Sequence, residues 1–434
     1  MTFAWTERAV HEALEISGGS EGTAFSGIST DTRTLTQDSL FVALAGERFD
    51  AHDFLAAAVT AGARAAIVRL NTPPVPGLRL IEVPDTLRAY GMLARARRRR
   101  IPGPVIAITG TNGKTSTKEL VAATLRTRWR THATRANLNN LVGVPQTILE
   151  SAEGTEALVV EAGASLPGEI ARYRSIIEPS ISVITNTSAG HVEGFGSVEA
   201  VMAEKLELVR QVPVAFVGTN PPSLAERSRA LGAAKVATVG LAKADLVPDK
   251  LEMGADGRPT LTVDGRTFTV PLLGAHQAAN ALFAWAIARE LGLDLDACAR
   301  ALAEVRLPGG RGEVIQAGRL TIVNDSYNAN PASFRTVIEV ARNMRAGRRL
   351  VFVAGTMREL GDASDREHHL IAEAIVGLKP DLVAVVGEFV RAVAPWVSML
   401  GNRLITSEDA PSLAPVLASR LQGDELVILK ASRG

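Results

Sequence analysis

The sequence predicts an α/β protein built from three domains. Length is the first reason, because 434 residues exceed what one ordinary hydrophobic core organises. Composition is the second, since 46% hydrophobic and 21% charged residues describe a folded chain rather than a disordered one. The third is a repeated alternation of short apolar runs with helical patterns, which predicts parallel sheets covered on both faces by helices.

Residues 1–100 form the first section, which mixes short strands and helices, with apolar runs at 40–44 and 65–68. A helical segment from about Asp85 leads to four consecutive arginines, Arg97 to Arg100. We interpret them as the solvated end of a helix, where cations suit the dipole, with phosphate or nucleic-acid contact as the alternative. The net charge of +1 gives no general attraction to nucleic acid or membranes.

Residues 101–307 form the second section, in which apolar strands and helices alternate. Strands are expected at 105–109, 157–160, 181–184 and 214–217, a β-hairpin insertion at 249–273 and a helix at 275–291. Residues 307–312 contain four glycines and prolines, so we expect a hinge there. The third section, 308–434, repeats the alternation, with strands expected at 320–324, 350–354, 382–386 and 425–429.

The most informative segment is Thr109-Gly-Thr-Asn-Gly-Lys-Thr-Ser-Thr117, which joins an apolar strand to a helical pattern. Backbone N–H groups of such a turn, together with the helix dipole, form a cradle for phosphate. Lys114 is expected to reach the β- and γ-phosphates, and Thr115 to offer its hydroxyl to Mg²⁺. Position 108 is Ile where the common motif has glycine, so this is a variant loop, with a chance match in a surface turn as the alternative. We predict ATP binding by Gly110, Thr111, Asn112, Gly113, Lys114, Thr115 and Ser116.

Polar residues follow further strands of the predicted central sheet. Glu161 and His191 come after two apolar runs, and the carboxyl ends of parallel strands face the ligand crevice. Glu161 is therefore expected to point toward the nucleotide and a metal, and His191 to be a metal ligand, which Mn²⁺ tolerates better than Mg²⁺. By spacing alone, Lys205 is an ordinary solvated helix lysine. Asp325 lies in a polar segment that fits either a turn or a ribose contact.

The single cysteine, Cys298, excludes an internal disulfide or a cysteine-rich zinc site. The sequence has no eighteen-residue apolar run and no signal-peptide pattern near Met1, so we expect a cytoplasmic protein without membrane insertion.

Taken together, these residues resemble the Mur ligase family, ATP-dependent amide ligases of peptidoglycan precursor synthesis. The similarity extends over essentially the whole chain, and the phosphate loop has the family's form, including the missing first glycine. Within the family, Asp325-Ser-Tyr-Asn-Ala-Asn-Pro331 is similar to the motif of members that join D-alanyl-D-alanine to a UDP-linked muramoyl tripeptide through an acyl phosphate. Further similar segments are 30–33, 46–52, 137–140, 143–145, 161–164, 186–197 and 356–361, with Ser364 and His368.

The resemblance implies a UDP-sugar-binding α/β domain at 1–100, a central parallel-sheet P-loop ATPase domain at 101–307 and a Rossmann-like C-terminal domain at 308–434. It implies catalytic roles for Lys114, Glu161, His191 and Lys205. Two Mg²⁺ ions, or Mn²⁺ in their place, would be held by Thr115, Glu161, His191 and Lys205, the last as a carbamylated lysine. Nucleotide contacts would come from His276, Asn280, Arg311 and Asp325, and substrate contacts from Thr30, Asp31, Arg33, Asn139, Asn140, Asn328 and Asn330.

The implied partners are small molecules, the UDP-muramoyl tripeptide and D-Ala-D-Ala, with no nucleic acid and with the chain as a monomer. Two alternatives stay open. One is a folylpolyglutamate synthase-type ligase, which the segment 325–331 and the N-terminal section oppose. The other is an ATP-binding partner protein without ligase activity. It stays open because the sequence stops at Gly434, where relatives carry another helix; Ala431, where the family pattern has glycine, is a separate departure.

Overall fold

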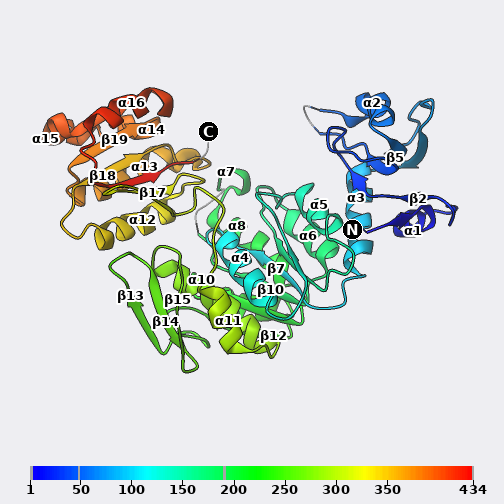
Figure 1. Cartoon of the computed structure of the whole chain (residues 1–434), viewed down its shortest axis with the longest axis horizontal. Coiled ribbons are helices and arrows are strands. Elements are labelled where there is room, and N and C mark those ends of the chain that lie inside the picture. Colours follow the sequence, from blue (N-terminus) through cyan, green and yellow to red (C-terminus); the bar gives the residue numbers. More distant parts are fainter. Residues whose placement is uncertain (1–2, 47–48, 189–191, 433–434) are drawn as a thin grey trace.

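The fold class expected from the sequence is confirmed in a computed structural model, which describes residues 3–46, 49–188 and 192–432. Three lobes follow one another along the chain (Figure 1). The N-terminal lobe lies at the upper right, the central lobe in the middle and the C-terminal lobe at the upper left. In the described ranges, no helix is long and apolar enough to cross a membrane.

The N-terminal lobe contains a four-stranded parallel sheet in the order β3-β4-β5-β6. Its strands are β3 (Ile28–Ser29), β4 (Ser39–Val42), β5 (Ala63–Arg69) and β6 (Arg79–Val83). A two-stranded ribbon of β1 (Trp5–Thr6) and β2 (Ala24–Phe25) lies beside it, with helices α1 (Glu7–Ala13), α2 (Leu55–Thr60) and α3 (Thr86–Arg98). Helix α3 shares a hydrophobic core with the central lobe.

The arginines at the end of α3 correct one expectation. We expected them to be solvated, but Arg97 is buried and donates to the carbonyls of Ser151 and Ala152 at 3.1 and 2.8 Å. Arg98 donates to the carbonyls of Ile177 and Glu178, both at 2.6 Å. These carbonyls follow or end central-lobe helices, where backbone oxygens lack helical partners. Arg97 and Arg98 therefore fasten α3 to the central lobe, whereas Arg99 and Arg100 are exposed, as expected.

The central lobe is built on a six-stranded parallel sheet in the order β12-β11-β10-β7-β9-β8. Its strands are β7 (Val105–Thr109), β8 (Thr131–Ala133), β9 (Ala157–Glu161), β10 (Ile181–Ile184), β11 (Val214–Gly218) and β12 (Lys235–Val239). The helices are α4 (Lys114–Leu125), α5 (Gly143–Leu149), α6 (Glu169–Ile177), α7 (Val192–Phe195), α8 (Val198–Leu206), α9 (Leu224–Ala230), α10 (Ala275–Glu290) and α11 (Leu295–Leu302).

Strand β7 is the point where the order of this sheet reverses, because β9 lies on one side of it and β10 on the other. Both strands, like β7, are buried along their whole length, which their continuous apolar sequences require. Ligands of such sheets bind in the crevice at the carboxyl ends of the strands next to the reversal. An antiparallel sheet of β13 (Lys250–Met253), β14 (Pro259–Val263) and β15 (Arg266–Thr269) forms the insertion.

The C-terminal lobe contains a second six-stranded sheet in the order β16-β17-β21-β18-β19-β20, in which β16 alone runs antiparallel. Its strands are β16 (Glu313–Ala317), β17 (Leu320–Asp325), β18 (Leu350–Ala354), β19 (Leu382–Val386), β20 (Leu404–Ser407) and β21 (Leu426–Lys430). The helices are α12 (Pro331–Met344), α13 (Ser364–Gly377), α14 (Glu388–Ala392), α15 (Val397–Leu400) and α16 (Ala410–Arg420).

Helix α12 connects the C-terminal lobe to the central lobe through apolar contact. Leu273, in the segment after β15, belongs to the same buried core as Val337, Val340 and Met344 of α12. Gly257 lies so close to α12 that a Cβ there would be 2.9 Å from Met344 Cγ. The insertion therefore supports one side of α12, and the opposite end of this helix faces the phosphate loop.

Candidate active site

The loop between β7 and α4 is held in one conformation by the end of β10. The N–H groups of Thr111 and Asn112 donate to the backbone and side-chain oxygens of Asn186, at 2.9 and 3.1 Å. The hydroxyl of Thr185 donates to the carbonyl of Asn112 at 2.6 Å. A Cβ at Gly110, whose φ is 148°, would lie 1.9 Å from Thr185 Oγ1, so only glycine fits there. The loop is thus pre-organised around its backbone N–H groups.

Lys114, the first residue of α4, curls back over this loop. Its ammonium donates to the carbonyls of Gly110 and Thr111 at 2.8 and 3.2 Å. Burial lowers the pKa of Lys114, and Arg311 lowers it further, whereas Glu161 opposes this effect. An anion bound in the loop would offset that loss of hydration, so the site favours phosphate electrostatically.

Glu161, at the end of β9, joins two other candidate residues. Its Oε2 accepts from the hydroxyl of Thr115 at 2.8 Å, and its Oε1 accepts from the side-chain amide of Asn139 at 2.9 Å. Glu161 is 2% exposed and Thr115 3% exposed. The structure therefore brings together Thr115, Asn139 and Glu161, which lie far apart in the sequence, beside the phosphate loop.

Lys205 lies within α8 and is buried, with 1% of its surface exposed. The solvated position suggested by helix spacing is therefore wrong. Burial lowers the pKa of Lys205 to about 7, and the positive charge of Lys114 contributes to this shift. His191, the other expected metal ligand, lies outside the described residues. Within the described ranges, no group of three or more His, Cys, Asp or Glu side chains could hold a metal ion.

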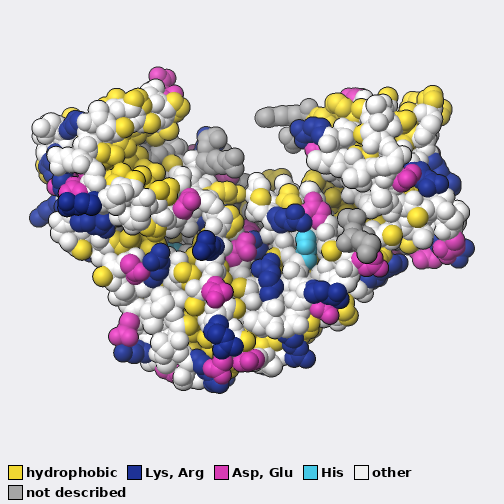
Figure 2. Space-filling model, viewed as in Figure 1, with side chains coloured by type: hydrophobic (Ala, Val, Ile, Leu, Met, Phe, Trp, Pro, Cys, Tyr) yellow, Lys and Arg dark blue, Asp and Glu magenta, His cyan; other side chains and the backbone are white. Residues whose placement is uncertain are grey.

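A cavity of about 910 Å³ opens between the central and C-terminal lobes. Figure 2 shows a separate, wider gap in the surface, between the N-terminal and C-terminal lobes and above the central lobe. The central wall includes the predicted Asn112, Gly113, Lys114, Thr115, Ser116, Asn139, Asn140, Glu161, His276 and Asn280. The C-terminal wall includes the predicted Arg311, Asp325, Asn328 and Asn330. Its size suits a nucleotide or a ligand of similar dimensions.

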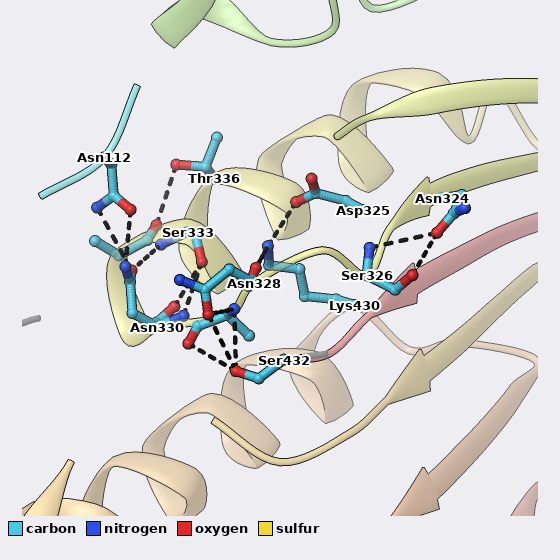
Figure 3. A network of polar contacts seen from close by, with 12 residues as sticks. Asn112, Asn324, Asp325, Ser326, Asn328, Asn330, Ser333, Thr336, Lys430 and Ser432 are labelled. Carbon is cyan, nitrogen blue, oxygen red and sulfur yellow. Dashed lines mark hydrogen bonds and ion pairs between the residues drawn. The ribbon is translucent and has the colours of Figure 1, made fainter. Parts of the chain in front are cut away.

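The C-terminal wall contains an ion pair between a buried lysine and a half-buried aspartate (Figure 3). Lys430, the last residue of β21, donates to Asp325 Oδ2 at 2.7 Å and to the carbonyl of Asn328 at 2.6 Å. Burial raises the pKa of Asp325, and the Lys430 ammonium opposes that change. The guanidinium of Arg311 lies 3.8 Å above the ring of Tyr327. Two cations thus line the wall opposite the phosphate loop.

Helix α10 supplies two further predicted residues. Asn280 accepts from the hydroxyl of Thr117 at 3.3 Å, and a Cβ at Gly113 would be 2.6 Å from Asn280 Oδ1. Asn280 therefore lies directly beside the phosphate loop. Desolvation within the cavity and the positive charge of Lys430 lower the pKa of His276, although its side chain is partly exposed.

The remaining candidates are placed differently. Asn140 Oδ1 accepts from the N–H groups of Val142 and Gly143 at 3.2 and 2.8 Å, so it shapes the start of α5. Thr30, Asp31 and Arg33 lie in the N-terminal lobe and do not line the cavity. Asp31 receives hydrogen bonds from the backbone N–H and guanidinium of Arg33, which hold its pKa at about 2.

Sequence reasoning did not single out Lys430 or Thr185 as site residues. Lys430 directly follows the apolar run Leu426–Leu429, so the strand-end argument that selected Glu161 would have found it. Thr185 follows β10 in the same way. Glu359, which also lines the cavity, lies in the family-like segment 356–361, but sequence reasoning did not single it out as a site residue.

Comparison with known proteins gives consistent matches. Residues 108–288 match the Mur ligase middle domain, and residues 310–433 match the Mur ligase, glutamate ligase domain. The UDP-N-acetylmuramoyl-tripeptide--D-alanyl-D-alanine ligase of Bacillus subtilis is 32% identical, over 95% of this chain and 92% of its own length.

Solved structures of MurF ligases have the same fold as this chain. A crystal structure of MurF from Acinetobacter baumannii superposes with a TM-score of 0.88 and 29% identity, covering 100% of this chain and 96% of that one. MurF ligase from Thermotoga maritima in complex with ADP gives 0.82 and 28%, covering 94% of both chains. Folylpolyglutamate synthase from Mycobacterium tuberculosis gives 0.61 and 22%, covering 80% of this chain and 92% of that one, and shares the fold alone.

Proposed function

The chain belongs to the Mur ligase family, and we propose that it joins D-alanyl-D-alanine to a UDP-N-acetylmuramoyl-tripeptide with hydrolysis of ATP. The observation that carries the proposal is the cavity in which the phosphate loop faces Asp325, Asn328 and Asn330 of the C-terminal lobe. The phosphate loop would supply ATP binding. Asp325, Asn328 and Asn330 belong to the segment 325–331, whose sequence is similar to that of D-Ala-D-Ala-adding ligases.

The reaction proceeds in two steps. A carboxylate oxygen of the tripeptide attacks the γ-phosphorus, the bond between that phosphorus and the bridging oxygen breaks, and ADP leaves. The amine of D-Ala-D-Ala then attacks the acyl carbonyl, loses a proton and expels phosphate. Lys114 and the loop N–H groups neutralise the charge on the transferring phosphoryl group, which is the main catalytic need of such chemistry.

The oxygen atoms beside the loop fit a magnesium ion. Thr115 Oγ1 and Glu161 Oε2 are 2.8 Å apart, and adjacent ligands at the usual Mg²⁺ distances are roughly 2.9 Å apart. Mg²⁺ keeps several waters and shares phosphate oxygens, so few protein ligands suffice. When bound, the ion would neutralise phosphate charge. We propose that Thr115 and Glu161 hold one ion, and that Lys205 and His191 serve a second.

Lys205 could serve a cation only after chemical modification. An unprotonated amine can add CO₂, forming a carbamate with two oxygen atoms and releasing a proton. Because burial lowers the pKa of Lys205 to about 7, the unprotonated amine is far more populated at neutral pH than in an ordinary lysine. This lowered pKa supports the proposal that Lys205 is carbamylated.

We also assign a role to each section of the chain. Residues 1–100, with Thr30, Asp31 and Arg33, would bind the UDP-muramoyl part of the substrate. Residues 101–307 would bind ATP, and residues 308–434 would close the site and bring Arg311, Asp325, Asn328 and Asn330 to the reactants. The proposed location is the cytoplasm, where ATP is available. The proposed working unit is a monomer, since one chain supplies both walls of the cavity.

Phosphate release by the purified protein tests this function. We expect release with ATP, Mg²⁺, UDP-muramoyl tripeptide and D-Ala-D-Ala together, at least about 100-fold above the rate with either acceptor substrate omitted. Product mass should equal that of the joined substrates minus water. A second incubation with folate and glutamate tests the main rival. Amide product there, with none from the muramoyl substrate, would replace the proposal with a folylpolyglutamate synthase-type reaction.

A further inference from the structure

Two asparagines from opposite walls of the cavity form a side-chain pair. Asn330 Nδ2 donates to Asn112 Oδ1 at 2.7 Å, and Asn112 Nδ2 lies 3.5 Å from Asn330 Oδ1 (Figure 3). Asn112 belongs to the phosphate loop, and Asn330 directly precedes α12 of the C-terminal lobe. Asn330 is 9% exposed. The pair therefore joins the ATP-binding loop to the other lobe.

Each partner is itself firmly held. The backbone of Asn112 is tied to the end of β10, because its N–H donates to Asn186 Oδ1 and its carbonyl accepts from Thr185 and Asn186 side chains. Asn330 forms a capping box with Ser333, in which Asn330 Oδ1 accepts from Ser333 N–H and Ser333 Oγ accepts from Asn330 N–H, both at 2.9 Å. A displacement of either side would strain the hydrogen bond between them.

The other end of α12 is held by contacts of a different kind. Leu273 and Met344 pack in a shared apolar core, and such packing is non-directional. A hydrogen bond, by contrast, depends on direction. The C-terminal end of α12 is therefore held by apolar packing, and the Asn112–Asn330 hydrogen bond fixes the direction of its N-terminal end.

The two residues before Asn330 are held by hydrogen bonds from the end of the chain's last strand. Lys430 donates to the carbonyl of Asn328, and the hydroxyl of Ser432 donates to the carbonyl of Ala329 at 3.3 Å. Both residues lie at or beyond the end of β21. The position of Asn330 is thus coupled to Asp325, which Lys430 also contacts.

We infer that Asn330 is a positioning residue whose pairing with Asn112 sets the orientation of the C-terminal lobe on the phosphate loop. In this role Asn330 acts through Asn112, in addition to the contact with the reactants proposed above. Its consequence for the reaction rests on the proposed function. With the pair formed, Asp325 and Arg311 are held over the loop. Without it, the lobe samples other orientations and fewer complexes have all reacting groups aligned.

The substitution Asn330→Ser separates positioning from helix capping. Serine caps helices about as well as asparagine, so α12 keeps its first turn, but its side chain is too short to reach Asn112. Asn112→Ala breaks the pair from the other side and leaves the cap intact. Asn343→Ser makes the same chemical change as Asn330→Ser at an exposed position of α12 and is the matched control.

In steady-state assays with both substrates, we expect Asn330→Ser to lower kcat about fivefold or more, while its thermal unfolding midpoint stays with that of Asn343→Ser. Asn112→Ala also lowers kcat. The kcat of the double variant should be no lower than that of the less active single variant, because both substitutions remove the same interaction. A kcat for Asn330→Ser equal to the parent's would overturn the inference, as would full additivity in the double variant.

A measurement of geometry tests the same inference without turnover. Spin labels on cysteines placed at the exposed Ser175 and Ser398 would report the distance between the two lobes, and the native Cys298 is buried. With a nonhydrolysable ATP analogue, we expect one narrow distance distribution in the parent and in Asn343→Ser, and a broad one in Asn330→Ser. Identical narrow distributions would overturn the inference. An inactive parent would instead count against the proposed function.

Discussion

At the residue scale, the site depends on how burial changes two lysines. Lys114 and Lys205 both lose hydration, which lowers the pKa of each, and the charge of Lys114 lowers that of Lys205 further. A bound phosphate would favour the protonated form of Lys114 and so offset the effect of desolvation. The charge of Glu204 only partly opposes the shift at Lys205, and a carbamate would convert this side chain from a cation into an oxygen ligand.

We predict that Lys205→Met lowers turnover about 100-fold, the scale expected when support for a bound metal is lost. In ¹³C-labelled bicarbonate, the parent should show a carbamate resonance that this variant lacks. A small carboxylic acid added in solution should restore part of the activity.

Lys235→Met is the matched control, because Lys235 is 57% exposed and pairs with Glu290 at the surface. It should keep both the resonance and the activity. Parental turnover in Lys205→Met, with an unchanged carbamate resonance, would show that Lys205 is a structural lysine only.

At the element scale, the segment between β18 and α13 depends on one neutral histidine. His368 Nε2 accepts from the N–H of Met357 at 2.9 Å, so the ring proton lies on Nδ1, which donates to the carbonyl of Ser364 at 2.8 Å. Burial lowers the pKa of His368, although the Ser364 carbonyl and the carboxylates of Glu388 and Asp365 oppose this. Protonation would remove the acceptor for Met357 N–H. This segment leads to Glu359 at the cavity, so its geometry matters for the site.

We predict that the free energy of unfolding falls as pH drops below 6.5, the ordinary value for histidine. The sign follows because the unfolded chain takes up this proton at a higher pH than the folded chain does. A buried N–H left without an acceptor costs about 1–3 kcal/mol, which sets the scale. Denaturant unfolding between pH 7.5 and about pH 5 measures the change.

His368→Gln should show a smaller loss over the same range, because glutamine can still accept from Met357 and does not titrate. His132 and His276, whose pKa values are also lowered, remain in both proteins and cancel in the difference. His369→Gln, at the exposed neighbouring position, serves as the control and should behave as the parent. Equal pH dependence in parent and His368→Gln would refute the assignment.

At the scale of the whole molecule, the strands that form the sheets were predictable and the contacts between lobes were not. Buried parallel strands such as β7 and β19 have continuous apolar sequences, which local pattern reveals. Strands β16 and β20 lie at the edges of the C-terminal sheet. Strand β16 is largely exposed and β20 is only partly buried, so neither has a continuous apolar sequence and both were missed.

In the site, too, features with a local sequence pattern were predictable and contacts between distant segments were not. The phosphate loop and Glu161 were predictable because each directly follows an apolar strand. The roles of Arg97 and of the Asn112–Asn330 pair were not, because their partners lie far along the chain, 218 residues apart in the second case. Such hydrogen bonds leave no local periodicity in the sequence. The burial of Lys205 was likewise invisible to helix spacing and was suggested only by family resemblance.

The central claim is that the cavity between the lobes activates a substrate carboxylate by transferring the γ-phosphoryl group of ATP to it. Isotope transfer tests this most directly. A UDP-muramoyl tripeptide with ¹⁸O in its terminal carboxylate would be joined to D-Ala-D-Ala, and the released phosphate analysed by mass spectrometry. We predict one ¹⁸O atom in inorganic phosphate for each amide formed. Amide product with unlabelled phosphate, or with the label in AMP, would contradict the account.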